Sequence, residues 1–332
     1  MEIGFFFWPY TPDLVRRMAR AADDYGYDMI GIADTPGNAM DPWVATTMVA
    51  ETVRQARIAL CVTNLESRHP SVSAASIASI DLLTARPSVL GIGAGHSGTR
   101  NLGIGASKVS DIERGVRYIK ELMSGAPAEL DGASAHLPWV ERPSQVFVAG
   151  SGPKTLRMAG AVADGAFVNF GIASETIRRS EGTVAEGAAA AGRDPGDVEM
   201  WQIAALDCNE DGAAARDKVG AILAFMAGGY ILAGDLAQRG VPEEHRDAIQ
   251  ELRRLYSTRP GDADAALVDR LGLFDYLTER FAIYGTPEQC AEQLARARDA
   301  GLKRVMFTVS VASDPARTVE LFGEKVLPQF RG

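Results

Sequence analysis

Residues 3–33 read IGFFFWPYTPDLVRRMARAADDYGYDMIGIA, the pattern of one strand–helix–strand unit. Its two short apolar runs, 3–7 and 29–33, are typical of buried strands, and the segment between them, 12–25, has apolar residues at helical spacing. Two strands joined through a helix run parallel in one sheet. The stretch therefore predicts an α/β fold.

The same alternation continues along the rest of the chain. Further apolar runs predict strands at 58–63, 89–93, 146–149, 165–170, 198–206 and 304–309. The eight predicted strands are joined by helices, and the amino-acid composition does not change along the chain. Both features favour a closed (β/α)₈ TIM barrel over an open sheet. We predict a single barrel domain over residues 1–332, with a helical insertion between the seventh and eighth strands at about 211–301.

Composition narrows the choice of partners. The 332 residues carry a net charge of −9 at pH 7, whereas nucleic acid requires an excess of Lys and Arg, so no nucleic-acid partner is expected. The N-terminal apolar run ends at Pro9 and is too short for a signal peptide or a membrane span, so no membrane partner is expected either. The three widely spaced cysteines predict neither disulfides nor a zinc site and fit a reducing, cytoplasmic location.

The loops that follow the strands form the active site in a barrel of this kind. The loop after the second strand contains Asp34, which either takes part in the chemistry or caps a turn. The loop after the fourth strand, Gly91–Gly98, has glycines that permit close backbone approach to a ligand. It also contains His96, which either moves a proton or orients a substrate near neutral pH, or is a hydrogen-bonded loop residue. We predict that His96 and Asp34 are the catalytic residues.

Two further loops have the character of ligand sites. The end of the third strand, Cys61–Pro70, concentrates hydrogen-bonding side chains, which favours a ligand site over the satisfaction of buried backbone groups. After the fifth strand, residues 150–152 are Gly-Ser-Gly and precede Pro153 at the start of a helix, where free N–H groups and the helix dipole favour a phosphate. Lys154 either neutralises that phosphate or lies in solvent.

Four motifs, in chain order, resemble the luciferase-like superfamily, and within it the F420-dependent oxidoreductases similar to methylenetetrahydromethanopterin reductase. They are Val62–Pro70, Leu90–His96, Val148–Lys154 with Ala163–Gly165, and Phe281–Glu288. Members of this superfamily are (β/α)₈ barrels with a late insertion that bind FMN or the deazaflavin F420 at the C-terminal mouth. The resemblance thus implies F420 as the cofactor, with FMN as the alternative.

The resemblance also implies which residues contact the cofactor. These are Cys61, Val62, Thr63, Asn64, Gly93, Gly95, Ala149, Gly150, Ser151, Gly152 and Lys154. Several F420-dependent members have a non-prolyl cis peptide bond at the end of the third strand, and by position Cys61–Val62 is the candidate here. The chain departs from some F420-dependent dehydrogenases at Thr35, where they have His, and at His96, where they have Glu. Their acid–base arrangement therefore does not transfer.

The predicted function is hydride transfer between F420 and a small organic substrate by a luciferase-like oxidoreductase. One alternative is an FMN-dependent two-component monooxygenase, which receives reduced flavin from a separate reductase. Another is a non-catalytic flavin-binding barrel; a barrel hydrolase is disfavoured because no nucleophile elbow is present. The resemblance suggests a homodimer, for which Met48, Val49 and residues 73–80 form either an apolar contact patch or ordinary core.

Overall fold

The computed structural model describes residues 1–84, 86–95, 97–229, 231–256, 265–310, 312 and 314–331. Its parallel strands form the predicted (β/α)₈ barrel, because each strand pairs with the next and the last pairs with the first. In barrel order they are β1 (Glu2–Phe7), β2 (Met29–Ile32), β3 (Arg57–Thr63), β4 (Val89–Ile92), β7 (Gln145–Gly150), β8 (Gly165–Val168), β9 (Glu199–Cys208) and β11 (Arg304–Thr308).

The helices begin where cap residues and prolines favour a start. Asp41 and Asp314 accept hydrogen bonds from first-turn N–H groups, and each is followed by a proline at the first helical position. The helices are α1 (Pro12–Asp24), α2 (Pro42–Thr52), α3 (Pro70–Asp81), α4 (Ser97–Arg100), α5 (Val109–Met123), α6 (Pro153–Val162), α7 (Ser174–Ala190), α8 (Gly212–Gly228), α9 (Glu243–Leu255), α10 (Ala265–Arg270), α11 (Phe274–Phe281), α12 (Pro287–Asp299) and α13 (Pro315–Lys325). Among the described helices, none is long and apolar enough to cross a membrane.

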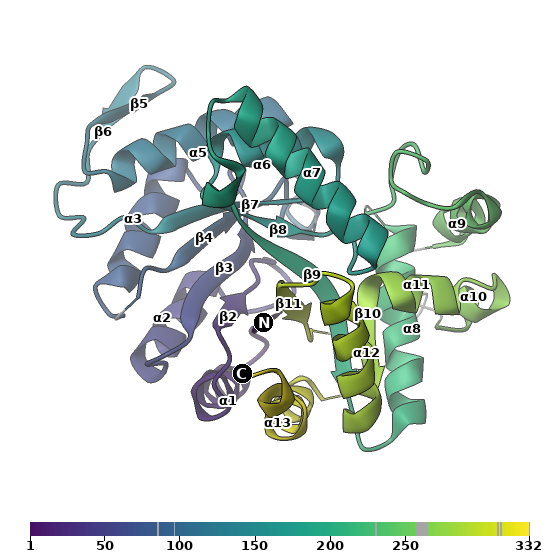
Figure 1. The fold of residues 1–332 in the computed structure, drawn as a ribbon. Coiled ribbons are helices and arrows are strands. Elements are labelled where there is room, and N and C mark those ends of the chain that lie inside the picture. The colour runs from purple at the N-terminus through teal and green to yellow at the C-terminus, as the bar shows by residue number, and fades with distance from the viewer. Residues whose placement is uncertain are drawn as a thin grey trace. The chain divides into compact units, whose positions relative to one another are not determined.

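The chain divides into two compact units. Unit 2 comprises residues 4–167 and 181–201. Within it α1, α2, α3, α5 and α6 contact one another in turn, along the outer side of the strands from β2 to β7 (Figure 1). An antiparallel hairpin of β5 (Ala128–Leu130) and β6 (Ala133–Ala135) projects from this unit. This hairpin was not predicted from the sequence.

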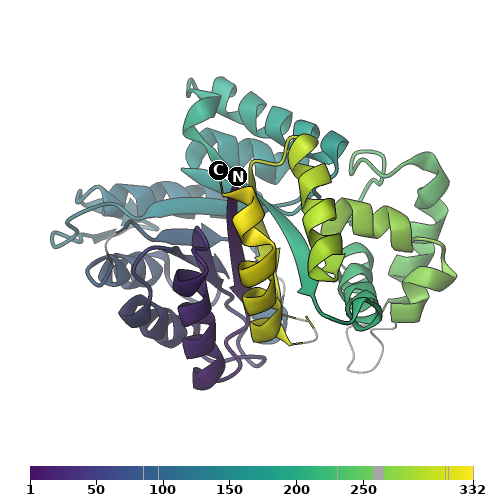
Figure 2. The ribbon, with the colours of Figure 1, turned by 60° about the horizontal axis from the view of Figure 1, so that its bottom comes forward.

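Unit 1 comprises residues 1–3, 168–180 and 202–332. Between β9 and β11 it contains α8 to α12 and a further strand, β10 (Ala282–Gly285), which pairs with the end of β9. Apolar side chains of α8, α9, α10 and α11 form a separate core there, including Leu223, Leu252 and Leu277. Figure 2 shows the two chain ends side by side, and the Met1 ammonium donates a hydrogen bond to the Phe330 carbonyl oxygen at 3.5 Å. The division leaves the prediction of a single domain untested.

Candidate active site at the strand ends

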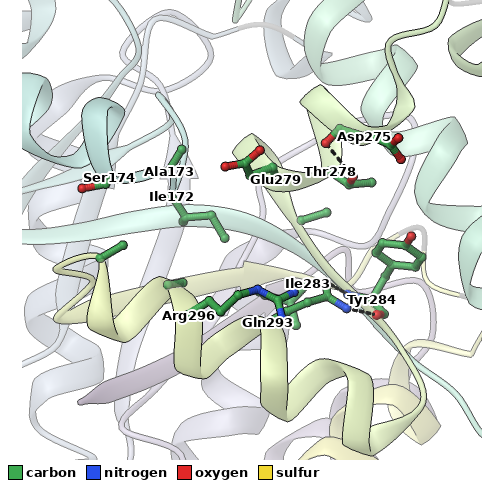
Figure 3. A pocket seen from close by; sticks show the side chains of 13 residues that line it. Ile172, Ala173, Ser174, Asp275, Thr278, Glu279, Ile283, Tyr284, Gln293 and Arg296 are labelled. Carbon is green, nitrogen blue, oxygen red and sulfur yellow. Dashed lines mark hydrogen bonds between the residues drawn. The ribbon is translucent and has the colours of Figure 1, made fainter.

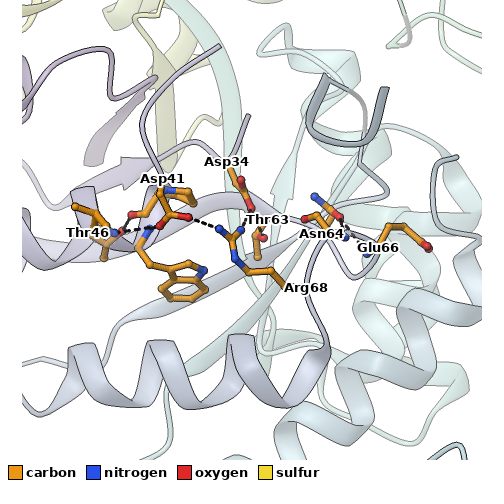
Figure 4. A network of polar contacts seen from close by, with 11 residues as sticks. Asp34, Asp41, Thr46, Thr63, Asn64, Glu66 and Arg68 are labelled. Carbon is orange, nitrogen blue, oxygen red and sulfur yellow. Dashed lines mark hydrogen bonds and ion pairs between the residues drawn. The ribbon is translucent and has the colours of Figure 1, made fainter. Parts of the chain in front are cut away.

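A polar network joins the ends of β2 and β3 (Figure 4). The Thr63 hydroxyl donates a hydrogen bond to Oδ2 of Asp34 at 2.7 Å, and the Arg68 guanidinium donates to the same oxygen at 2.9 Å. Another nitrogen of Arg68 donates to Asp41, the N-cap of α2. Arg68 therefore links two successive strand-end loops. The sequence analysis quoted Arg68 in a motif but did not assign it to the site.

The Asp34 carboxylate is buried and only partly satisfied. Its side chain is 0% exposed, and among the residues that the structure describes its second oxygen, Oδ1, has no hydrogen-bond partner. Burial raises the pKa of Asp34, while the Thr63 hydrogen bond and the Arg68 charge lower it less strongly. A buried acceptor without a donor costs about 1–3 kcal/mol. The Asp34 carboxylate therefore forms an ion pair with Arg68 and a hydrogen bond with Thr63, which favours a role in the site over the alternative role as a turn cap.

The end of β3 has the backbone feature that the resemblance implies. The peptide bond Cys61–Val62 is cis, which confirms the prediction, and the pairing of β3 with β4 shifts register here. Val62 lies against Gly91 and Gly93, where an added methyl group would approach its Cγ atoms to 2.8 and 2.9 Å. The two glycines therefore leave the space that the Val62 side chain needs. Burial raises the pKa of the Cys61 thiol, so this residue is no thiolate nucleophile.

Asn64 shapes the turn after β3. Its Oδ1 accepts hydrogen bonds from the N–H groups of Glu66 at 3.0 Å and Ser67 at 2.8 Å. The side chain is buried, and the nearby Ser67 hydroxyl is buried without a partner. The predicted contact of Asn64 with the cofactor ring stays a prediction.

The loop after β4 packs onto the strand ends. Gly95 has φ +78°, a conformation that favours glycine, and its carbonyl oxygen accepts a hydrogen bond from Thr99 at 2.9 Å. A methyl group added to Gly98 in α4 would lie 2.9 Å from the Asp34 carbonyl oxygen and 3.3 Å from Nδ2 of Asn64. His96 lies outside the described residues, so its catalytic role stays a prediction.

The end of β7 forms a cradle for an anion. Gly152 is the N-cap of α6 and, having no side chain, leaves the first-turn N–H groups without a hydrogen bond from the cap residue itself. A methyl group on Gly150 would approach the Thr155 side chain to 2.7 Å. Ala149, Gly150, Ser151 and Gly152 are half-buried, while Lys154 is exposed. These features fit a phosphate group, and the contact itself stays a prediction.

Unit 1 contains a separate pocket of about 500 Å³ between α11, β10, α12 and residues 172–174 (Figure 3). Its charged lining side chains are Asp275, Glu279 and Arg296. The Gln293 amide donates to the Tyr284 carbonyl oxygen at 2.6 Å and accepts from its N–H at 3.2 Å. Three lining residues, Ala282, Ile283 and Tyr284, belong to the motif Phe281–Glu288, but no pocket was predicted there. The predicted site residues that the structure describes all belong to unit 2 instead.

Comparison with known proteins identifies the family. The family model described as luciferase-like monooxygenase matches residues 9–304. The chain belongs to this family. The resemblance predicted from the motifs is therefore confirmed.

Among the relatives of this luciferase-like chain, 5,10-methylenetetrahydromethanopterin reductase of Methanolobus tindarius is 24% identical over 98% of this chain and 100% of the relative. The fold is similar to that of the coenzyme F420 dependent tetrahydromethanopterin reductase from Methanopyrus kandleri, with a TM-score of 0.77, 21% identity and 100% of both chains covered. It is also similar to an F420-dependent secondary alcohol dehydrogenase in complex with an F420-acetone adduct, with a TM-score of 0.75, 17% identity and coverage of 100% and 99%. The prediction of a luciferase-like oxidoreductase is confirmed at this level.

Proposed function

We propose that the protein is an F420-dependent oxidoreductase that transfers a hydride between the deazaflavin and a small organic substrate. The observation that carries this proposal is the end-to-end similarity to a methylenetetrahydromethanopterin reductase, over 98% of this chain and 100% of the relative. Bound F420 supplies the hydride chemistry, and the protein supplies position and proton handling.

The strand-end residues have the properties that this cofactor needs. Residues 150–152 and the first turn of α6 bind the phosphate, because the N–H groups and the dipole at a helix N-terminus attract an anion. The backbone around Val62 and Gly93 lies against the ring. Asp34 holds or delivers the proton at Oδ1, the oxygen that its neighbours leave unpaired. His96 remains the second proposed proton-handling residue.

FMN is the alternative cofactor, since the matching family model is one of luciferase-like monooxygenases. In that case a separate reductase supplies reduced flavin. Titration of the protein with F420 and with FMN, followed by fluorescence, separates the two. We expect saturable F420 binding and at least tenfold weaker FMN binding. Tighter FMN binding would select the monooxygenase, and binding of neither would leave the non-catalytic barrel.

A charge placed at the cradle tests its role. Gly152→Asp is expected to cap α6 itself and to repel a phosphate, so F420 should bind at least tenfold more weakly while the fold gains about 1 kcal/mol. Pro242→Asp is the matched control, because Pro242 is the N-cap of α9 and also makes no side-chain cap bond. It adds the same charge and should leave F420 binding unchanged. Equal effects of both variants would contradict the cradle assignment.

The homodimer also belongs to this proposal. Val44 on α2 and Val72 on α3 are 55% and 54% exposed, on two helices that contact each other. By contrast, Val49 and several residues of 73–80 are buried, so core packing explains them. We expect Val72→Glu to convert a dimer to a monomer in sedimentation experiments, while Leu255→Glu on α9 does not. A monomeric wild-type protein would refute this part, and the cytoplasmic location stays a prediction.

A further inference from the structure

The pocket of about 500 Å³ in unit 1 has acidic and basic side chains on opposite sides (Figure 3). Asp275 and Glu279 lie one turn apart on α11, and Arg296 lies across from them on α12. We propose that this pocket binds a small zwitterion in which an apolar spacer separates an ammonium group from a carboxylate. The ammonium group contacts the two acidic side chains, and the ligand carboxylate contacts Arg296. This inference goes beyond the proposed function and does not depend on it.

The pocket has an apolar lining between its charged sides. Ile172, Ala282, Ile283 and Ala297 contribute to this lining, and all four are buried in the protein. Small-ligand sites have volumes of roughly 300–1,000 Å³ and combine such a lining with a few polar groups that orient the ligand. The pocket therefore suits a spacer of several methylene groups, whose removal from water favours binding.

The charged side chains of the pocket are available to a ligand. Within the part of the chain that the structure describes, Asp275, Glu279 and Arg296 form no ion pair and no side-chain hydrogen bond. All three residues are exposed, so a ligand reaches them without displacing another protein group. Opposite charges placed against them form charge-assisted hydrogen bonds, which are stronger than hydrogen bonds between neutral groups.

Two neutral polar side chains of the pocket, by contrast, already have partners. The Thr278 hydroxyl donates a hydrogen bond to the Phe274 carbonyl oxygen at 2.8 Å. The Gln293 amide is held by both backbone polar groups of Tyr284. The charged groups therefore contribute more than these two neutral ones to the choice of ligand.

The balance of charge favours a zwitterion over other ions. Two carboxylates and one guanidinium give Asp275, Glu279 and Arg296 a net charge of −1 when all three are ionised. A dianion would bring a negative group towards the two carboxylates, and a dication would bring a positive group towards Arg296. A zwitterion avoids both repulsions, because each of its ends meets a side chain of opposite charge.

An adjoining pocket of about 330 Å³ shares Arg296 and adds Arg216 and Glu292 to the charged lining. Arg216 donates hydrogen bonds to both carboxylate oxygens of Asp269, at 2.8 and 3.0 Å. Arg296 is therefore the better site for a ligand carboxylate. Glu292, one turn before Arg296 on α12, adds negative charge and so further disfavours a dianion.

Three six-carbon probes that differ in their terminal charges test the proposal: 6-aminohexanoate as zwitterion, hexane-1,6-diamine as dication and adipate as dianion. Their binding to the full chain is measured by ligand-observed NMR titration at low ionic strength, because salt screens exposed charges. We expect 6-aminohexanoate to bind at least fivefold more tightly than the diamine and at least tenfold more tightly than adipate. Equal or tighter binding of the diamine or of adipate, or no binding of 6-aminohexanoate, would overturn the proposal.

Variants of the pocket should change which probe is preferred, an effect that a general loss of structure would not produce. Arg296→Gln should bind 6-aminohexanoate at least fivefold more weakly and the diamine at least as tightly as wild type. Asp275→Asn/Glu279→Gln should lose the diamine and bind adipate more tightly than wild type does. Arg298→Gln is the matched control, because it removes a positive charge from the same helix outside the pocket lining. Equal effects of Arg296→Gln and Arg298→Gln, or an unchanged preference in both pocket variants, would refute the assignment.

This experiment requires no F420 and is independent of the proposed function. The lining residues of the pocket all belong to unit 1, whereas the described residues of the predicted cofactor site belong to unit 2. Failure of 6-aminohexanoate to bind would therefore overturn only the zwitterion site, and failure of F420 to bind would overturn only the proposed function.

Discussion

Replacing Arg68 with Met preserves much of the side-chain length and removes the charge that faces Asp34. Arg68 is 20% exposed and Asp34 is 0% exposed, so this half of the network is mostly shielded from solvent. Breaking a buried ion pair by removing one partner costs about 3–5 kcal/mol. The contact with Asp41, which is 45% exposed, adds only about 0–1 kcal/mol. Because Arg68 retains some solvent contact, we expect a loss of about 3 kcal/mol in the free energy of unfolding.

Urea unfolding at pH 7, followed by circular dichroism, measures this loss. A double-mutant cycle with Asp34→Asn isolates the interaction, since the neutral amide does not need the guanidinium charge. We expect a coupling energy of about 1–3 kcal/mol. Effects of the two substitutions that add within about 0.5 kcal/mol would refute the view that Arg68 stabilises the buried carboxylate.

Arg68→Met is also expected to change how the free energy of unfolding depends on pH. Burial raises the pKa of Asp34, the nearby Asp41 carboxylate raises it further, and Arg68 lowers it. A carboxyl with a raised pKa binds its proton more tightly in the folded state, so stability falls as pH rises from about 3.9, the unfolded value, through the folded pKa. Arg68→Met raises that folded pKa, so its stability should fall more than that of wild type between pH 4 and 7. Parallel stability curves would contradict the assignment.

Four other outcomes are expected, three from the packing of glycines and one from cofactor binding. Gly187→Ala is expected to destabilise the fold by about 1–3 kcal/mol in thermal melts, because its methyl group would lie 1.9 Å from the Arg157 carbonyl oxygen and push α7 from α6. The methyl group of Gly182→Ala, on the same helix, meets nothing within 4 Å, so this variant should stabilise the fold by about 0.5–1 kcal/mol. If both variants stabilised or both destabilised the fold, this account of the packing would be wrong. Gly93→Ala displaces Val62 and should weaken F420 binding about tenfold, a shift of roughly 1.4 kcal/mol in titration; unchanged affinity would remove this strand end from the cofactor site. F420 at about 100 times its Kd should stabilise wild type by about 2.7 kcal/mol, and no stabilisation would count against F420 as the cofactor.

The succession of strands and helices was readable from the sequence because it depends on local patterns. Predicted strands such as 58–63 and 304–309 agree with β3 and β11 within one residue at each end. The β5–β6 hairpin was missed because its strands have only three residues each, AEL and ASA, and three residues are too few for an alternation of apolar and polar side chains to predict a strand.

The sequence by itself determined which loops follow the strands and that Asp34 and Gly150–Gly152 lie in them, and the family resemblance predicted the cis bond at Cys61–Val62. Only the tertiary structure decided how these loops contact one another. Arg68 meets Asp34 across 34 positions of the chain, and Gly98 packs onto the Asp34 backbone from another loop. Periodicity and capping act between near neighbours in sequence, whereas burial, ion pairing and an unpaired oxygen result from contacts between distant segments. The loops were therefore predictable, but the buried state of Asp34 was not.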